Sequence, residues 1–175
     1  MIFHNLSIEG PLRIEYEPRG DERGHFMRTF CANELKEQGV EFRIAQINRS
    51  RTARRGTIRG MHFQIRPWAE AKIVSCLRGK IYDVAIDIRE GSPTYGKWAS
   101  IELAEDKNTA IYIPPGFAHG FQALEEECEV EYFMSEFYHP EEASGVRWND
   151  PVFNIVWPVP NPVLSDRDAN WPLLT

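Results

Sequence analysis

The chain has 175 residues, enough for one domain that buries a single sizeable core without disulfides. Hydrophobic residues make up 42% and charged residues 26%, and no apolar run approaches the roughly 20 residues of a membrane-spanning helix, so no membrane association is expected. The net charge of −6 argues against binding a polyanion through bulk charge, so no nucleic-acid partner is expected either.

The start of the chain and its cysteines bear on the compartment. No basic segment followed by an apolar one opens the sequence, so we expect a cytoplasmic protein. Cys31, Cys76 and Cys128 are odd in number and form no CxxC pair. This pattern favours free thiols packed as small hydrophobic residues over a disulfide framework.

The N-terminal part of the chain contains the one segment that predicts a helix. The stretch ANELKEQG (32–39) has Asn33 as its expected N-cap and Gly39 as its C-terminal stop. Elsewhere short apolar runs alternate with turn residues, a pattern typical of all-β sandwiches and barrels. The chain is therefore expected to be mostly β.

The segment TIRGMHFQ (57–64) predicts a strand with an irregularity. In an ideal strand Arg59 and His62 would lie on opposite faces. Gly60 lies between them, and a glycine inside a strand often marks a bulge that redirects side chains. We expect such an irregularity at Gly60.

The segments from 72 to 138 predict further strands. Lys72 shares its face with Val74 and Cys76, which favours the interior, and Tyr132 shares its face with Val130. The stretch KIYDVAIDIR (80–89) alternates strictly, which predicts a strand with one well-buried face.

The end of the chain, residues 139–175, loses this periodicity and is rich in Pro, Trp and Asp. So many large apolar groups predict a tail that packs over the barrel. We expect a single domain over 1–175, with N-terminal strands and a short helix in about 1–50, a barrel core in 51–138 and a C-terminal tail in 139–175.

The motif PPGFAHGF (114–121) matches the second signature of the cupins, Pro-x-Gly-x-x-His, through Pro114, Gly116 and His119. Metal-binding cupins also carry a His-x-His pair, but the corresponding stretch here reads MHFQ, with Gln64 in place of the second histidine. An amide is a poor ligand for a transition metal. The sequence therefore predicts an all-β cupin jelly-roll barrel, with a short helix in its N-terminal half, that uses no metal and no cofactor.

Several motifs together resemble one cupin family along nearly the whole chain. RGTIRGMHFQ, AKIVSCLRGKIYDVAIDIREGSPTYGKW, IPPGFAHGF, YFMSEFYHPE, GVRWNDP and LSDRDANWPLL occur in the order and spacing of the dTDP-4-dehydrorhamnose 3,5-epimerases. The resemblance implies a metal-independent isomerase of rhamnose-type deoxysugar biosynthesis. It also implies a homodimer whose N-terminal segment reaches the neighbouring subunit, and a nucleotide-linked 4-keto-6-deoxyhexose as substrate.

The resemblance assigns four catalytic residues. His62 matches the family's base, and Asp168 matches the carboxylate that orients it. Lys72 matches the cation near the sugar's C4 oxygen, and Tyr132 matches the acid that reprotonates the opposite face. Epimerisation next to a ketone needs such a set, because it requires a base, an acid and a group that stabilises the enolate.

The resemblance also assigns the groups that hold the substrate. Arg59 and His119 match residues that meet the diphosphate and sugar, and Tyr138 matches the aromatic residue that stacks on the base. Further binding positions are Arg23, Gln46, Asn48, Arg28 and Arg167.

Four positions depart from the family pattern, at Arg28, Ile47, Ala143 and Arg167. At Arg28 the family usually has Glu, so an acceptor is replaced by a donor, and the preferred nucleotide or sugar could differ. Three alternatives stay open: epimerisation at C3 only, 3,4-ketoisomerisation, and a sugar-nucleotide binding module without turnover.

Overall fold

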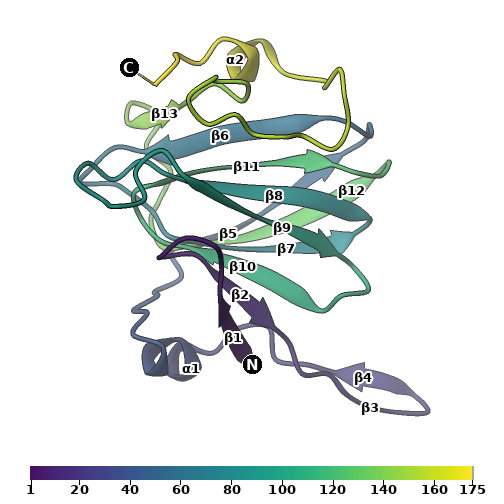
Figure 1. Ribbon diagram of the computed structural model, residues 1–175. Coiled ribbons are helices and arrows are strands. Elements are labelled where there is room, and N and C mark those ends of the chain that lie inside the picture. Colours follow the sequence, from purple (N-terminus) through teal and green to yellow (C-terminus); the bar gives the residue numbers. More distant parts are fainter. Residues whose placement is uncertain (175) are drawn as a thin grey trace.

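The computed structural model describes residues 1–174 and consists mainly of two sheets packed face to face, whose neighbouring strands are antiparallel (Figure 1). The six-stranded sheet has the order β1 (Ile2–Asn5), β2 (Leu12–Glu15), β10 (Thr109–Ile113), β7 (Lys72–Arg78), β12 (Cys128–Met134) and β5 (Gln46–Thr52). The five-stranded sheet has the order β13 (Ala143–Gly145), β6 (Ile58–Gln64), β11 (Phe117–Ala123), β8 (Lys80–Asp87) and β9 (Trp98–Ala104). The predicted all-β fold is confirmed.

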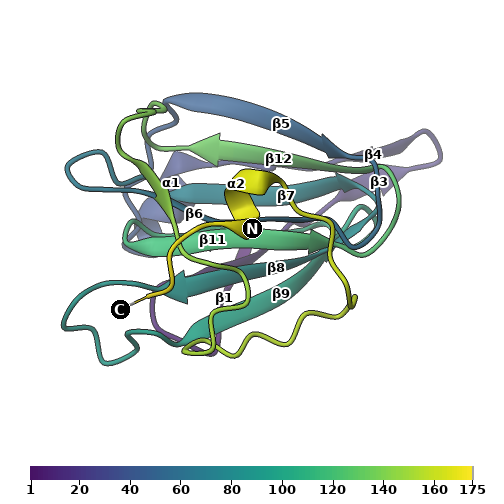
Figure 2. The same ribbon diagram turned by 90° about the horizontal axis from the view of Figure 1, so that it is seen from above.

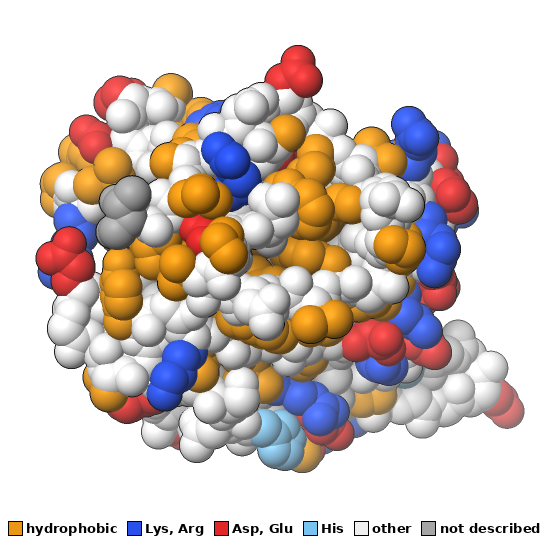
Figure 3. All heavy atoms as spheres, turned by 45° about the horizontal axis from the view of Figure 1, so that its top comes forward, with side chains coloured by type: hydrophobic (Ala, Val, Ile, Leu, Met, Phe, Trp, Pro, Cys, Tyr) orange, Lys and Arg blue, Asp and Glu red, His pale blue; other side chains and the backbone are white. Residues whose placement is uncertain are grey.

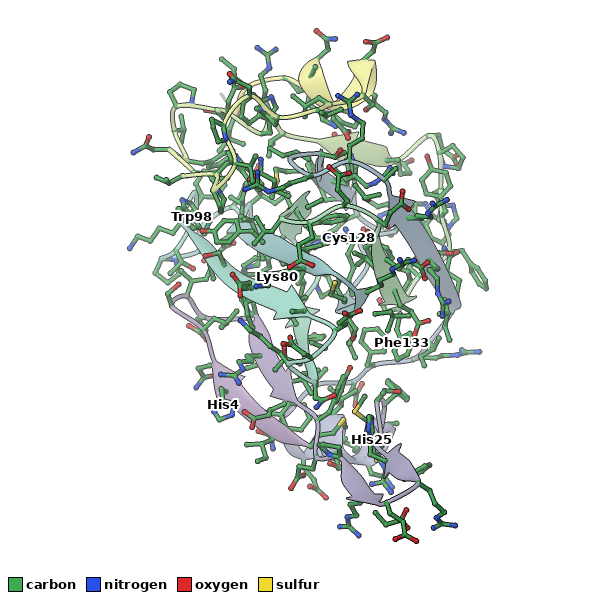
Figure 4. The ribbon with its side chains drawn as sticks, turned by 90° about the vertical axis from the view of Figure 1, so that its right-hand side faces the viewer. His4, His25, Lys80, Trp98, Cys128 and Phe133 are labelled. Atoms are coloured by element: carbon green, nitrogen blue, oxygen red, sulfur yellow. The ribbon has the colours of Figure 1, made fainter. Side chains whose placement is uncertain are left out.

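Four smaller elements lie outside the two sheets. The strands β3 (Arg19–Asp21) and β4 (Gly24–Phe26) form a hairpin that projects from the body, with His25 far from the barrel (Figures 1 and 4). Helix α1 (Ala32–Glu37) follows the hairpin, and the short helix α2 (Asp166–Ala169) lies near β6 at the opposite end of the molecule.

The main core lies between the inner faces of the two sheets. Val74 and Val130 of the six-stranded sheet pack with Ala85 and Phe121 of the five-stranded sheet, and all four are essentially inaccessible to solvent. Period-two alternation sends these side chains inward. Lys72 is also buried, which confirms the interior position that its parity predicts.

Side chains on the outer faces of both sheets are also buried. For residues 80–89 the sequence predicted only one buried face. The outer face of the six-stranded sheet packs against α1 through Leu35. On β8, Val84 packs outward under the C-terminal segment together with Phe153, while Asp83 on the other face is fully buried as well. The prediction of one buried face is therefore wrong, because the tail covers the face that would otherwise meet solvent.

Helix α1 confirms the predicted helix but corrects its N-cap. Cys31 is the N-cap residue and makes no side-chain capping bond, whereas Asn33 lies inside the first turn. The stop is as predicted, because Gly39 follows the C-cap Gln38 with φ +75°. Glycine takes this left-handed conformation without the steric penalty of a Cβ.

Gly60 produces the predicted irregularity in β6. The register between β6 and β11 shifts after the His62–His119 pair. Gly60 has φ +155°, and a Cβ there would come within 2.6 Å of the Gly120 Cα, so a close approach of two strands requires glycine. As a result Arg59 and His62 both line one cavity.

The C-terminal segment packs over β6 and β11, as predicted (Figures 1 and 2). Val163 forms an isolated parallel β-bridge with Thr57. The Trp157 ring packs edge-on against the Tyr82 ring of β8. Some of its side chains remain exposed, including Val152, and Figure 3 shows hydrophobic side chains spread across this face.

Two further expectations concern thiols and membranes. All three cysteines are free, with Cys76 and Cys128 buried as predicted and Cys31 only half-buried. Among residues 1–174, no helix has the length and apolar character needed to cross a membrane.

Candidate active site

A cavity of about 520 Å³ opens between strands β5, β7 and β12 of one sheet and β6 and β11 of the other. It is lined by all four predicted catalytic residues: His62, Lys72, Tyr132 and Asp168. It is also lined by six of the eight predicted binding residues: Gln46, Asn48, Arg59, His119, Tyr138 and Arg167.

The first feature of the cavity is a His–Asp pair. His62 Nε2 lies 2.6 Å from Asp168 Oδ1; the carboxylate is buried, whereas the imidazole side chain is 44% exposed. Asp168 is held by α2, whose N-cap Ser165 accepts its backbone N–H. Burial raises the pKa of Asp168, but the hydrogen bond and charge of His62, together with hydrogen bonds from the Gly60 backbone and Ser165, lower it by more, so the pKa lies below its ordinary value. The carboxylate therefore stays charged and fixes the imidazole, whose Nδ1 is free to accept a proton.

The second feature is a buried ammonium beside a buried carboxylate. Lys72 Nζ lies 3.0 Å from Glu70 Oε1 and donates to the His62 carbonyl oxygen at 3.1 Å. The other Glu70 oxygen accepts the Gln64 backbone N–H. An ammonium has three donors, so one remains for a ligand in the cavity.

The third feature is the half-buried phenol of Tyr132 on β12, in the other sheet from His62. The Tyr132 hydroxyl lies 3.0 Å from the Ser50 hydroxyl of the neighbouring strand β5. Burial raises the pKa of Tyr132 more than this hydrogen bond lowers it. Tyr132 is therefore protonated at neutral pH and can donate a proton.

A second His–Asp pair lies deeper in the barrel. His119 Nε2 is 2.9 Å from Asp83 Oδ2, and both side chains are buried. The His119 ring meets the Tyr132 ring edge-on. The other Asp83 oxygen has no hydrogen-bond partner among the described residues. Of the two residues, only His119 lines the cavity.

Cationic and aromatic groups line the rest of the cavity. Arg59 is fixed by bonds to the Thr52 hydroxyl and the Arg51 carbonyl. The Arg167 guanidinium lies 4.8 Å above the Trp171 ring. Tyr138 is 56% exposed. A planar guanidinium suits a phosphate, and an exposed aromatic ring suits a flat base.

Arg23 and Arg28 lie apart from this cavity. Arg23 forms a bidentate pair with Asp21 inside the β3–β4 hairpin. Arg28 donates to Glu34 of α1 and lines a separate pocket near Met1. Within one protomer, the structure does not bring these two arginines to the other ten residues.

Sequence reasoning missed several polar residues of the site, among them Glu70 and Ser50 in the cavity lining and Asp83, which bonds His119. Glu70 lies two positions before Lys72, so parity alone would have placed both on one face. Asp83 alternates with outward-facing Val84 on β8, which points it inward. Ser50 carries no signal of its own, because its hydrogen bond to Tyr132 exists only where β5 and β12 pair.

The structure also explains Gln64. Its side-chain amide makes hydrogen bonds to the backbones of Trp68, Phe137 and His139. The amide therefore holds two backbone segments together instead of serving as a metal ligand. Across residues 1–174, no group of three or more His, Cys, Asp or Glu side chains could hold a metal ion.

The fold and the cavity define a jelly-roll cupin whose site is equipped for proton transfer next to a stabilised anion. Comparison with known proteins agrees. The family described as dTDP-4-dehydrorhamnose 3,5-epimerase matches residues 5–175, and a protein of that name from Methanothermobacter thermautotrophicus is 45% identical over 97% of this chain and 92% of its own. The chain belongs to the dTDP-4-dehydrorhamnose 3,5-epimerase family, which confirms the resemblance of its motifs.

Two further relatives are informative. A crystal structure of a Legionella pneumophila 3,5-epimerase in complex with dTDP-4-keto-L-rhamnose has a TM-score of 0.93 and 38% identity, covering 98% of this chain and 92% of that one. A dTDP-4-dehydrorhamnose 3-epimerase from Streptomyces niveus is 41% identical, covering 97% of this chain and 82% of the relative.

Proposed function

We propose that this protein is a 3,5-epimerase that inverts C3 and C5 of a dTDP-linked 4-keto-6-deoxyhexose. The observation that carries the proposal is the placement of His62, Lys72 and Tyr132 around one cavity, with Asp168 behind His62. Protons at C3 and C5 are acidic because each conjugate base is an enolate delocalised onto the C4 oxygen. Each epimerisation needs removal of a proton from one face and its return to the other.

The proposed chemistry assigns one task to each group. The Nε2–H of His62 donates to Asp168, so Nδ1 accepts the carbon-bound proton as that C–H bond breaks. The electron pair moves onto the C4 oxygen, where the free donor of Lys72 stabilises the enolate. Tyr132 then donates its hydroxyl proton to the opposite face of the same carbon.

The proposed binding mode uses the cationic, histidine and aromatic side chains that line the cavity. Arg59, Arg167 and His119 hold the diphosphate and sugar, and Tyr138 stacks on the base. Gln46 and Asn48, both on β5, contact the nucleotide.

We also propose a homodimer in which the β3–β4 hairpin reaches the partner's cavity. The hairpin projects from the body, its Phe26 is 79% exposed, and Arg23 and Arg28 lie too far away to serve the cavity of their own protomer. Such an exchange brings both arginines to a site. The single-domain organisation and the cytoplasmic location stay predictions.

Epimerisation at C3 alone is the second candidate, because a 3-epimerase is among the relatives. Deuterium incorporation from D2O distinguishes the two. Exchange at both C3 and C5 supports the double epimerase, and exchange at C3 alone supports the second candidate. A parallel panel of dTDP-, CDP- and GDP-linked sugars tests whether Arg28 changes the nucleotide. Binding without exchange in any ligand would leave a sugar-nucleotide binding module.

A further inference from the structure

The side chain of Gln64 connects two loops at the mouth of the cavity. It is only 7% exposed at the end of β6. Its Nε2 donates to the Trp68 carbonyl at 2.9 Å and to the Phe137 carbonyl at 3.1 Å, and its Oε1 accepts the His139 N–H at 2.7 Å. One amide therefore uses both donors and its acceptor on the backbone of segments that follow β6 and β12.

The Gln64 contacts hold the residues immediately before and after Tyr138 in the chain. Phe137 and His139 are bound by Gln64, and the Tyr138 N–H donates to the Gln46 Oε1 at 3.2 Å. The His139 ring stacks on the Trp68 ring at 4.0 Å, which joins the same two loops a second time. The backbone of 137–139 is thus fixed, while the Tyr138 ring remains exposed at the cavity.

Only an amide meets the hydrogen-bond demand at this position. A glutamate would place acceptors against two carbonyl oxygens, and a methionine of similar shape would leave the same three backbone groups without this partner. The demand arises entirely from the two loops, so the residue type is set by loop geometry and not by the chemistry of the reaction.

We propose that Gln64 is a positioning residue for nucleotide binding: it fixes Tyr138 so that its ring is preorganised to stack on the base. The proposal rests on the proposed function, because it assigns Tyr138 to the nucleotide. A preorganised aromatic residue raises affinity by reducing the ordering required on binding. Gln64 therefore acts on nucleotide affinity and not on proton transfer.

Gln122 offers a matched control. It is also a buried glutamine whose amide joins backbone groups, donating to the Val159 carbonyl at 2.8 Å and accepting the Val159 N–H at 2.9 Å. It lies on β11, outside the lining of the cavity. Gln64→Met and Gln122→Met should both lower the melting temperature, but only the first should weaken binding of dTDP.

The experiment measures the dTDP dissociation constant by calorimetry, and KM and kcat by deuterium exchange. For Gln64→Met we expect about a 10- to 100-fold weaker dTDP affinity, a KM raised in parallel and a kcat within about twofold of wild type, which corresponds to losing two or three hydrogen bonds. In the background of Tyr138→Ala, the same substitution should cost little further affinity, because the two residues act through one contact.

Three outcomes overturn the inference: unchanged dTDP affinity in Gln64→Met, an equal loss in Gln122→Met, or additive losses with Tyr138→Ala. If Gln64→Met does not fold, Trp68→Leu loosens the same loops from a partly exposed position and must show the selective loss of affinity. The proposed function is tested separately by wild type, since its failure would appear as no exchange in any sugar nucleotide.

Discussion

The buried Glu70–Lys72 pair gives a prediction that separates stability from chemistry. The two charged groups are 3.0 Å apart with side chains only 4% and 8% exposed. At an effective dielectric constant of about 20, Coulomb's law gives an attraction of about 5 to 6 kcal/mol at this distance. Breaking a buried pair by removing one partner costs about 3 to 5 kcal/mol, because the remaining charge is unpaired.

Lys72→Met should therefore lower the free energy of unfolding by about 3 kcal/mol. The double variant Glu70→Gln/Lys72→Met should recover about 2 kcal/mol of that loss, because no buried charge remains and the Gln64 N–H keeps an acceptor. Both variants should lose deuterium exchange, because neither has an ammonium at the enolate oxygen.

The assay is urea unfolding followed by tryptophan fluorescence, beside deuterium exchange on the same samples. Lys80→Met serves as a control, since Lys80 is partly exposed and lies 3.9 Å from Glu102. This variant should lose less than about 1 kcal/mol of stability and keep its exchange activity. A double variant that is no more stable than Lys72→Met, or that still exchanges, would refute the reasoning.

Three further predictions concern other carboxylates and the phenol. Asp168→Asn should reduce the exchange rate by about 10- to 150-fold, because a charge-assisted bond to His62 worth about 1.5 to 3 kcal/mol is lost; an unchanged rate in single-turnover measurements would contradict this. Burial raises the pKa of Asp87, but hydrogen bonds from Arg89 and from the Ser92 and Thr94 hydroxyls together lower it by more, so the pKa lies below its ordinary value. Its stabilisation is therefore present above the unfolded pKa near about 4 and is lost as the pH falls toward the folded pKa. Asp87→Asn should flatten the acid side of a stability–pH curve measured by thermal unfolding, and an unchanged curve would exclude this role. Tyr132→Phe should still exchange deuterium through His62 but retain configuration, which NMR of the product can detect.

The sequence predicted those parts of the site that follow from local periodicity. Lys72 is interior because it lies on the same strand face as the buried Val74 and Cys76, and Gly60 redirects β6 because glycine permits a close approach to β11. In both cases the controlling interaction lies within a few residues, or in a steric property of one residue type.

Features that depend on distant segments were not predicted. The outer face of β8 is buried because the tail returns over it, some 70 residues later in the chain. Asp83 meets His119 only because β8 and β11 pair. The N-cap is Cys31 and not Asn33 because the extended backbone ends two residues earlier than predicted and the helix begins at Ala32. Such contacts are set by the tertiary fold, which period and propensity do not specify.

The most direct test of the proposed function is the configuration of the product. Wild-type protein would be incubated with dTDP-4-keto-6-deoxyglucose in D2O, and C3 and C5 of the product would be assigned by NMR. The account predicts inversion at C3 and C5 with one deuterium incorporated at each carbon. A folded His62→Ala variant should show neither inversion nor deuterium incorporation. Unchanged configuration at both carbons, or full activity in His62→Ala, would contradict it.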